Sequence, residues 1–251
     1  LCSIGDPNSS TSSIALEYEN YWKSLRLIAS VSQFSRDIFY FINHLLKTSI
    51  GSIKSANFMW LLGLLDEISA VGAIGGQWEQ EYDALVKSGH HVDKENPYQD
   101  IVQLSLKSIN ATASLIDIKA DLTTDQTYAL IQALAHQCLN PCFQIRSYAL
   151  SSLEDTVLKI KLTDDLKASG IFDFGIFPLL NEDIAKNEIL SLISKVYLHF
   201  FKLGKADNAI FLKILDIYNQ FLEDPAIESE LQNLITSKKE IEKETGVNVE
   251  V

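Results

Sequence analysis

Apolar side chains recur at helical spacing along almost the whole 251-residue chain, and this periodicity limits the fold more than any other feature. From Glu17 onward, one apolar stripe runs from Tyr18 to Ile28 and the next runs from Phe34 to Leu45. No segment alternates convincingly between apolar and polar residues over the length of a strand. We therefore expect an all-α fold.

Local signals divide this pattern into helices. The residues around 58–68 are apolar on most faces, which predicts a buried helix, and a short amphipathic helix is expected over 77–88. Between them lie three glycines, which we interpret as a helix terminator: Gly72, Gly75 and Gly76. Gly89 is expected to lie at C′ of the second helix.

Helix-capping residues occur further along the chain. Thr123 and Gln126 have the spacing of a capping box, and Asn140 followed by Pro141 is typical of an N-cap and first helical position. Three more helices are expected, roughly over 182–203, over 207–223 with Asp207 as its cap, and over 226–244.

About ten helices joined by short turns fit an α-solenoid of HEAT/armadillo-like helical hairpins better than a four-helix bundle. The first 16 residues are rich in Ser, Asn, Gly and Pro and predict a flexible lead-in. We expect residues 17–251 to form a single α-solenoid domain. Because the chain begins at Leu1, we also expect it to be a segment of a larger protein.

The charge balance excludes some partners. With 33 acidic and 21 basic side chains the formal net charge is −12, which argues against a nucleic-acid partner. Lys238, Lys239 and Lys243 are interleaved with glutamates, so direct lipid binding through this segment is not expected. Three cysteines favour a reducing compartment, and the apolar run Phe58–Leu65 is too short to cross a bilayer.

Candidate catalytic or metal-binding groups are sparse. His90, His91 and Asp93 share one loop, but adjacent histidines rarely converge on one ion without ligands from elsewhere. Cys138 fits a small core residue rather than a metal ligand beside His136. Acidic pairs such as Asp66–Glu67 are expected mostly at helix starts or on exposed faces, where they are solvated or favour the helix dipole. We expect no cofactor, no metal site and no catalytic residue in this segment.

The segment 140–153 has the spacing of one solenoid repeat. A short polar residue, Asn140, precedes Pro141, and Ile145 and Ala149 are expected to face the core. Arg146 is expected at the layer edge, where it can bond to carbonyls or to a carboxylate of the adjacent repeat.

A longer stretch, from Leu130 to Leu180, resembles the second homology region downstream of the catalytic domain in the large, brefeldin-sensitive Golgi Arf guanine-nucleotide exchange factors of the Gea/GBF type. In that family an I/V-R-x-x-A-L-x-x-L helix is followed by F-x-x-x-F-P-L-L. The matching residues here, beyond Ile145 and Arg146, are Leu134, Ala149, Leu150, Leu153, Phe172, Phe177, Pro178, Leu179 and Leu180.

The resemblance implies a non-catalytic regulatory or scaffolding segment of an Arf activator, cytoplasmic and peripheral to Golgi membranes, in vesicle transport. Its implied partners are other domains of the same exchange factor, with Arf or Rab-type small GTPases and Golgi membrane proteins as further ones. Two alternatives stay open: a HEAT/armadillo-type scaffold from another trafficking or transport protein that binds a peptide or small GTPase, and a helical enzyme.

Overall fold

The computed structural model describes residues 19–29, 32–48, 53, 55–90, 95–119, 121–182 and 184–245. The expected lead-in, 1–16, lies outside these residues. The chain divides into two compact units, unit 1 up to Leu153 and unit 2 from Glu154 onward, and each is described by itself. The extent of the single domain expected over 17–251 stays a prediction.

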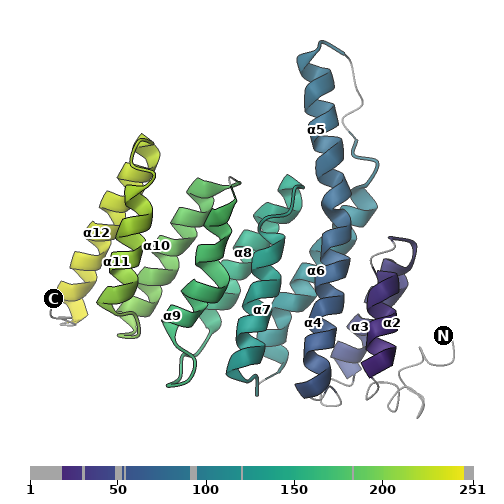
Figure 1. Cartoon of the computed structure of the whole chain (residues 1–251), viewed down its shortest axis with the longest axis horizontal. Coiled ribbons are helices and arrows are strands. Elements are labelled where there is room, and N and C mark those ends of the chain that lie inside the picture. The colour runs from purple at the N-terminus through teal and green to yellow at the C-terminus, as the bar shows by residue number, and fades with distance from the viewer. Residues whose placement is uncertain are drawn as a thin grey trace. The chain divides into compact units, whose positions relative to one another are not determined.

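Within the described residues all regular secondary structure is helical, as expected, so the all-α class is confirmed (Figure 1). Unit 1 contains α2 (Glu19–Ala29), α3 (Ser32–Thr48), α4 (Ser55–Ala70), the 3₁₀ turn η2 (Val71–Ala73), α5 (Ile74–Lys87), α6 (Gln99–Ile118) and α7 (Thr124–Gln137). Helix α8 (Phe143–Lys159) begins in unit 1 and ends in unit 2. Unit 2 contains α9 (Ala168–Ile171), the π-helical η3 (Phe172–Ile176), the 3₁₀ turn η4 (Phe177–Asn181), α10 (Lys186–Lys202), α11 (Asn208–Asn219) and α12 (Pro225–Thr245).

Helix α4 forms the centre of unit 1. It packs against α2, α3, α6 and α7, and Leu61, Leu64, Leu65 and Ile68 are fully buried. A helix that is apolar on most faces needs neighbours on most sides, and α4 has them. The buried helix expected over 58–68 is confirmed.

The three glycines after α4 do not end the helix, contrary to the sequence-based expectation. The chain stays helical from α4 through η2 into α5. A Cβ on Gly72 would lie 2.4 Å from Ile145 Cδ1, and one on Gly76 would lie 2.5 Å from the backbone nitrogen of Cys142. The glycines are therefore needed for close packing against neighbouring segments, which a local pattern cannot distinguish from a helix stop.

The continuous helical stretch Asn57–Lys87, 31 residues, is long and apolar enough to span a membrane by length and composition. The sequence-based expectation considered only the run Phe58–Leu65 and therefore underestimated the length of the apolar helix. Half of the most apolar window of this stretch is buried inside the unit, and a buried core helix passes the same test of length and hydropathy. The length of this helix is therefore weak evidence for a membrane span.

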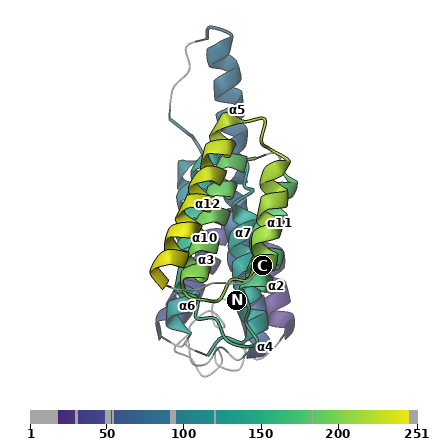
Figure 2. The ribbon, with the colours of Figure 1, turned by 90° about the vertical axis from the view of Figure 1, so that its left-hand side faces the viewer.

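Unit 2 is built around α10, whose Tyr197, Phe200 and Phe201 are fully buried. Helices α11 and α12 pack against it and against each other (Figure 2). From α12 only Ile227 and Leu234 are buried, so this last helix covers the unit with a narrow apolar stripe.

The helix caps expected at Thr123, Asp207 and Gly89 are confirmed, whereas α8 begins at Phe143, so Pro141 precedes this helix and is not its first residue. Thr123 Oγ1 accepts a hydrogen bond from the backbone nitrogen of Gln126, and the Gln126 side chain accepts one from the nitrogen of Thr123. Asp207 Oδ1 accepts from the nitrogen of Ile210 at 3.0 Å. Gly89 follows α5 with a φ of 82°, the left-handed conformation expected at C′.

Candidate functional site

The repeat motif predicted at 140–153 forms the turn before α8 and the buried face of that helix. Asn140 is buried, and its Oδ1 accepts a hydrogen bond from the backbone nitrogen of Cys142 at 3.0 Å. Ile145, Ala149 and Leu153 are fully buried. Of the remaining motif positions, Pro141 is exposed and Leu150 is half-buried.

Arg146 binds the backbone of this turn. Its Nη1 donates hydrogen bonds to the carbonyl oxygens of Asn140, at 2.9 Å, and Pro141, at 3.3 Å. The guanidinium carbon also lies 5.5 Å from the ring centroid of Phe143. Both carbonyl acceptors belong to the turn that precedes Arg146's own helix. The geometry gives Arg146 a local role in fixing the entry to α8.

A carboxylate from α5 binds the start of α8. Glu79 Oε2 accepts a hydrogen bond from the backbone nitrogen of Phe143 at 2.9 Å, and Oε1 accepts one from Cys142 Sγ at 3.4 Å. A negative charge at a helix N-terminus is favoured by the helix dipole and by the unsatisfied N–H groups there. Gly76 allows α5 to approach this turn closely. No local pattern in the sequence identifies Glu79, because its partners are 63 and 64 residues away.

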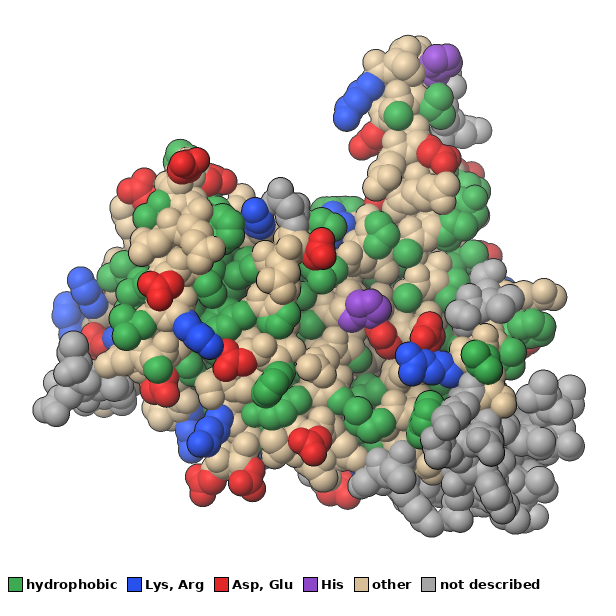
Figure 3. Space-filling model, viewed as in Figure 1, with side chains coloured by type: hydrophobic (Ala, Val, Ile, Leu, Met, Phe, Trp, Pro, Cys, Tyr) green, Lys and Arg blue, Asp and Glu red, His purple; other side chains and the backbone are tan. Residues whose placement is uncertain are grey.

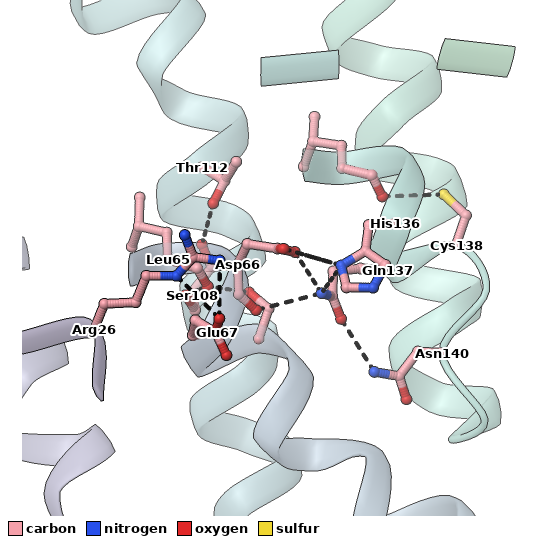
Figure 4. A network of polar contacts seen from close by, with 12 residues as sticks. Arg26, Leu65, Asp66, Glu67, Ser108, Thr112, His136, Gln137, Cys138 and Asn140 are labelled. Atoms are coloured by element: carbon pink, nitrogen blue, oxygen red, sulfur yellow. Dashed lines mark hydrogen bonds and ion pairs between the residues drawn. The ribbon is translucent and has the colours of Figure 1, made fainter. Parts of the chain in front are cut away.

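A network of polar side chains connects α4, α7 and the same turn (Figure 4). Asp66 Oδ1 lies 2.9 Å from His136 Nδ1 and accepts a hydrogen bond from Gln137 Nε2 at 2.7 Å. Gln137 Oε1 accepts a hydrogen bond from Asn140 Nδ2 at 3.1 Å. Asn140 thus bonds both the helix before the turn and the first residues after it.

The interpretation of Asp66 and Glu67 as solvated carboxylates was wrong. Both lie near the C-terminal end of α4, where Asp66 bonds His136 and Glu67 forms an ion pair with Arg26 of α2 at 3.1 Å. The hydrogen bond that His136 donates to Asp66 raises the pKa of His136, and partial burial opposes that rise only in part. Their partners are distant in sequence, so periodicity alone could not identify these pairs.

Two hydroxyl groups extend this network to α6. Ser108 Oγ donates to the carbonyl oxygen of Leu65 at 2.7 Å, and Thr112 Oγ1 donates to the carbonyl oxygen of Ser108 at 3.0 Å (Figure 4). Small hydroxyl side chains let α4 and α6 lie close while their polar atoms stay hydrogen-bonded.

The second half of the predicted motif lies in unit 2. Phe172 is fully buried and its ring centroid is 5.2 Å from that of Phe177, while Leu179 is buried. Pro178 is exposed and Leu180 is half-buried. These residues form a packed irregular helical segment.

The remaining metal-site candidates lie partly outside the described residues. His90 Nδ1 lies 2.9 Å from Ser88 Oγ, whereas His91 and Asp93 lie outside the described residues. Cys138 is fully buried and its thiol donates to the carbonyl oxygen of Leu134 at 3.4 Å. Among the described residues no group of three or more His, Cys, Asp or Glu side chains could hold a metal ion.

The fold and these contacts define a helical-repeat segment held together by its own polar side chains. Residues 127–241 match the model of a family described as the GBF1-like tetratrico peptide repeat region. Tetratrico peptide arrays stack helix pairs, as HEAT and armadillo arrays do. The match agrees with the expected solenoid class and describes its repeats as tetratrico peptide units.

Two curated relatives are similar over most of the chain. ARF guanine-nucleotide exchange factor 2 of Saccharomyces cerevisiae is 48% identical over 238 residues, and ARF guanine-nucleotide exchange factor 1 of the same yeast is 35% identical over 244 residues. These alignments cover 91% and 92% of this chain but only 16% and 17% of the two relatives. The resemblance to the Arf exchange factors of the Gea/GBF type is therefore confirmed, and the chain is a homologue of one segment of them.

Proposed function

We propose that this chain is a non-catalytic regulatory or scaffolding segment of an Arf guanine-nucleotide exchange factor that acts in vesicle transport at the Golgi. The observation that carries the proposal is the 48% identity to one such yeast factor over nearly the whole chain, which matches only 16% of that relative. A scaffold from an unrelated trafficking protein is not favoured by this similarity.

The polar groups of unit 1 support a structural task for the segment. His136, Asp66 and Gln137 bond one another, and Glu79 is bound to the first residues of α8. A catalytic site needs titratable groups that converge on a space open to substrate, whereas these groups are directed at one another and at the backbone.

Arf is the partner that the names of the relatives imply for the whole exchange factor. For the segment itself we propose contacts with other domains of the same factor, with Rab-type GTPases and Golgi membrane proteins as further candidates, on the cytoplasmic side of the Golgi. On the face shown in Figure 3, acidic and basic side chains are interleaved. Such a mixed surface favours protein contacts over adhesion to anionic lipid.

The test compares the intact exchange factor with a version that lacks these residues. Nucleotide exchange on Arf is measured in solution without membranes, and recruitment to the Golgi is measured in cells. We expect an unchanged exchange rate in solution and reduced recruitment or activity in cells, because the segment influences where the factor acts and not the chemistry.

A matched control replaces the segment with the corresponding region of the yeast relative that is 48% identical. This replacement should restore recruitment if the loss comes from the segment and not from a misfolded parent. A purified 251-residue chain that accelerates nucleotide release from Arf without the rest of the factor would contradict the proposal.

A further inference from the structure

Unit 1 contains an open groove of about 780 Å³ between α3 and α6, with one residue of α8 at its edge. The volume is typical of a ligand-binding cleft, for which about 300–1,000 Å³ is usual. Its floor is apolar and formed by Phe39, Leu46, Leu106 and Ala111. The groove does not include the polar network of Figure 4 or the turn before α8.

Polar side chains line both walls of this groove at helical spacing. On α6, Gln103, Lys107 and Asn110 follow one another at intervals of four and three residues, so they share one face. On α3, Asn43 and Lys47 are four residues apart and share the facing wall.

Most of these polar side chains do not contribute hydrogen bonds or ion pairs to the fold. Asn43, Lys47, Gln103 and Lys107 make no hydrogen bond or ion pair with any residue that the structure describes. Asn110 is the exception, since its Oδ1 accepts a hydrogen bond from the Tyr148 hydroxyl at 3.4 Å. The amides of Asn43 on one wall and Gln103 on the other are therefore available to a ligand, together with the two lysines.

The charge of the groove is opposite to that of the chain. Its thirteen lining residues include two lysines, Lys47 and Lys107, and no carboxylate. The chain as a whole has 33 acidic and 21 basic side chains. A lysine pair without carboxylate neighbours favours an acidic ligand.

We propose that this groove binds an extended, acidic peptide segment of a partner protein. The backbone of an extended peptide has open N–H and C=O groups, which the amides of Asn43 and Gln103 can satisfy, whereas a helical ligand has already satisfied its own. Lys47 and Lys107 bind its carboxylates, and Tyr40 and Ile118, both exposed, contact its apolar side chains. The face of α6 from Gln103 to Ile118 is about 22 Å long, which accommodates about six or seven extended residues. This inference does not depend on a role in Arf activation.

The experiment selects ligands from a phage library of random dodecapeptides on the 251-residue chain. We expect the enriched peptides to contain more Asp and Glu than the library. Labelled copies of them, measured by fluorescence anisotropy, should bind about tenfold more weakly to the double variant Lys47→Glu/Lys107→Glu, because two ion pairs are lost and replaced by repulsion. The affinity should also fall as salt is added.

The matched control is Lys161→Glu/Lys239→Glu, which makes the same change in net charge at two exposed lysines outside the groove. It should bind the selected peptides as the unaltered chain does. A milder pair, Lys47→Gln/Lys107→Gln, tests the site if the charge reversal lowers the melting temperature. Selected peptides without an acidic excess, equal binding by both double variants, or a selection that enriches nothing would each overturn the proposal.

Discussion

Two regions of the molecule join helices in different ways. In unit 1, α4 and α5 meet α6 and the turn before α8 through glycines and hydrogen-bonded polar groups. In unit 2, α10 meets α11 through stacked aromatic rings, and a lysine of α12 lies over two of the rings. The first contact is set by how closely two backbones can approach, and the second is set by how large side chains fill the space between helices.

The unit 1 contact has almost no spare space. Besides the backbone nitrogen of Cys142, a Cβ on Gly76 would meet the carbonyl carbon of Pro141 at 2.5 Å. The turn is also fixed by Asn140, Arg146 and Glu79, so it cannot shift without breaking hydrogen bonds.

The unit 2 contact uses rings and one lysine. The ring of Tyr197 lies 5.6 Å from that of Phe201 and 5.3 Å from that of Phe211, measured between centroids. Lys238 of α12 lies over both phenylalanine rings, with Nζ 4.6 Å from the centroid of Phe201 and 5.0 Å from that of Phe211, and it also pairs with Glu242. Cation–π contacts of this kind compensate a partly buried lysine for the hydration that it loses on burial.

The comparison shows that small residues and large residues limit these contacts in opposite ways. A backbone contact tolerates no added atom, because neither backbone can rotate away. In an aromatic contact the side chains fill the space between the helices, and the stability of the contact also depends on whether each buried hydroxyl group has a hydrogen-bond partner.

The largest expected effect is that of Gly76→Ala. Overpacking costs about 1–3 kcal/mol, and here the cost should be at the upper end since the clash is with backbone atoms. The higher helix propensity of Ala offsets about 1 kcal/mol of this. We expect a net loss of about 2 kcal/mol in the free energy of unfolding, measured from urea denaturation of the 251-residue chain.

Gly63→Ala is the control, since Gly63 also lies inside a helix but an added Cβ would be 3.6 Å from its nearest neighbour, Arg26 Nη1. This variant should be stabilised by up to about 1 kcal/mol through helix propensity. Equal effects of the two substitutions would mean that close backbone approach does not limit the unit 1 contact.

The helical periodicity was sufficient to predict the fold class and many helix ends. The caps at Thr123 and Asp207 were predictable because each involves residues only three positions apart. The buried positions Ile145, Ala149 and Leu153 were predictable because the side of α8 that faces the core repeats at helical spacing.

The candidate sites were less predictable, since their contacts join distant segments. Gly76 looks like a helix stop when only its neighbours in sequence are known, and Asp66 looks solvated when His136 is 70 residues away. The groove between α3 and α6 was missed for the same reason. Its amides and lysines occur at unremarkable spacing on each helix, and only the packing of α3 on α6 brings the two rows together.

A smaller effect is expected from removing tyrosine hydroxyls in unit 2. The Tyr218 hydroxyl accepts from Ser194 Oγ at 2.7 Å and donates to the carbonyl oxygen of Leu190 at 3.0 Å, whereas the Tyr197 hydroxyl is buried without a hydrogen-bond partner among the described residues. Tyr218→Phe should lower the free energy of unfolding by about 1 kcal/mol.

Tyr197→Phe is the matched substitution, because both rings are fully buried. It should leave stability unchanged or raise it, since an unsatisfied buried hydroxyl is costly. Thermal and urea unfolding of the two variants side by side would measure the difference. A larger loss for Tyr197→Phe than for Tyr218→Phe would contradict this assignment of the hydroxyl partners, because both substitutions keep the ring and remove only the hydroxyl group.

The smallest expected effect concerns the charge of His136 in the unit 1 network. Asp66 raises the pKa of this histidine in the folded chain above its unfolded value, which is about 6.5. The stabilisation is therefore fully present below the unfolded pKa and is lost as the pH rises through the folded pKa. The unaltered chain should lose a little stability as the pH rises above about 6.5, and His136→Gln should lose less over the same range. Because the His136 side chain is 61% exposed, solvent screening keeps the effect small.

An NMR titration of the ring protons provides the direct measurement, with Asp66→Asn as the control that keeps an acceptor but removes the charge. If His136 titrates at the same pH in both proteins, the contact with Asp66 contributes packing and not charge.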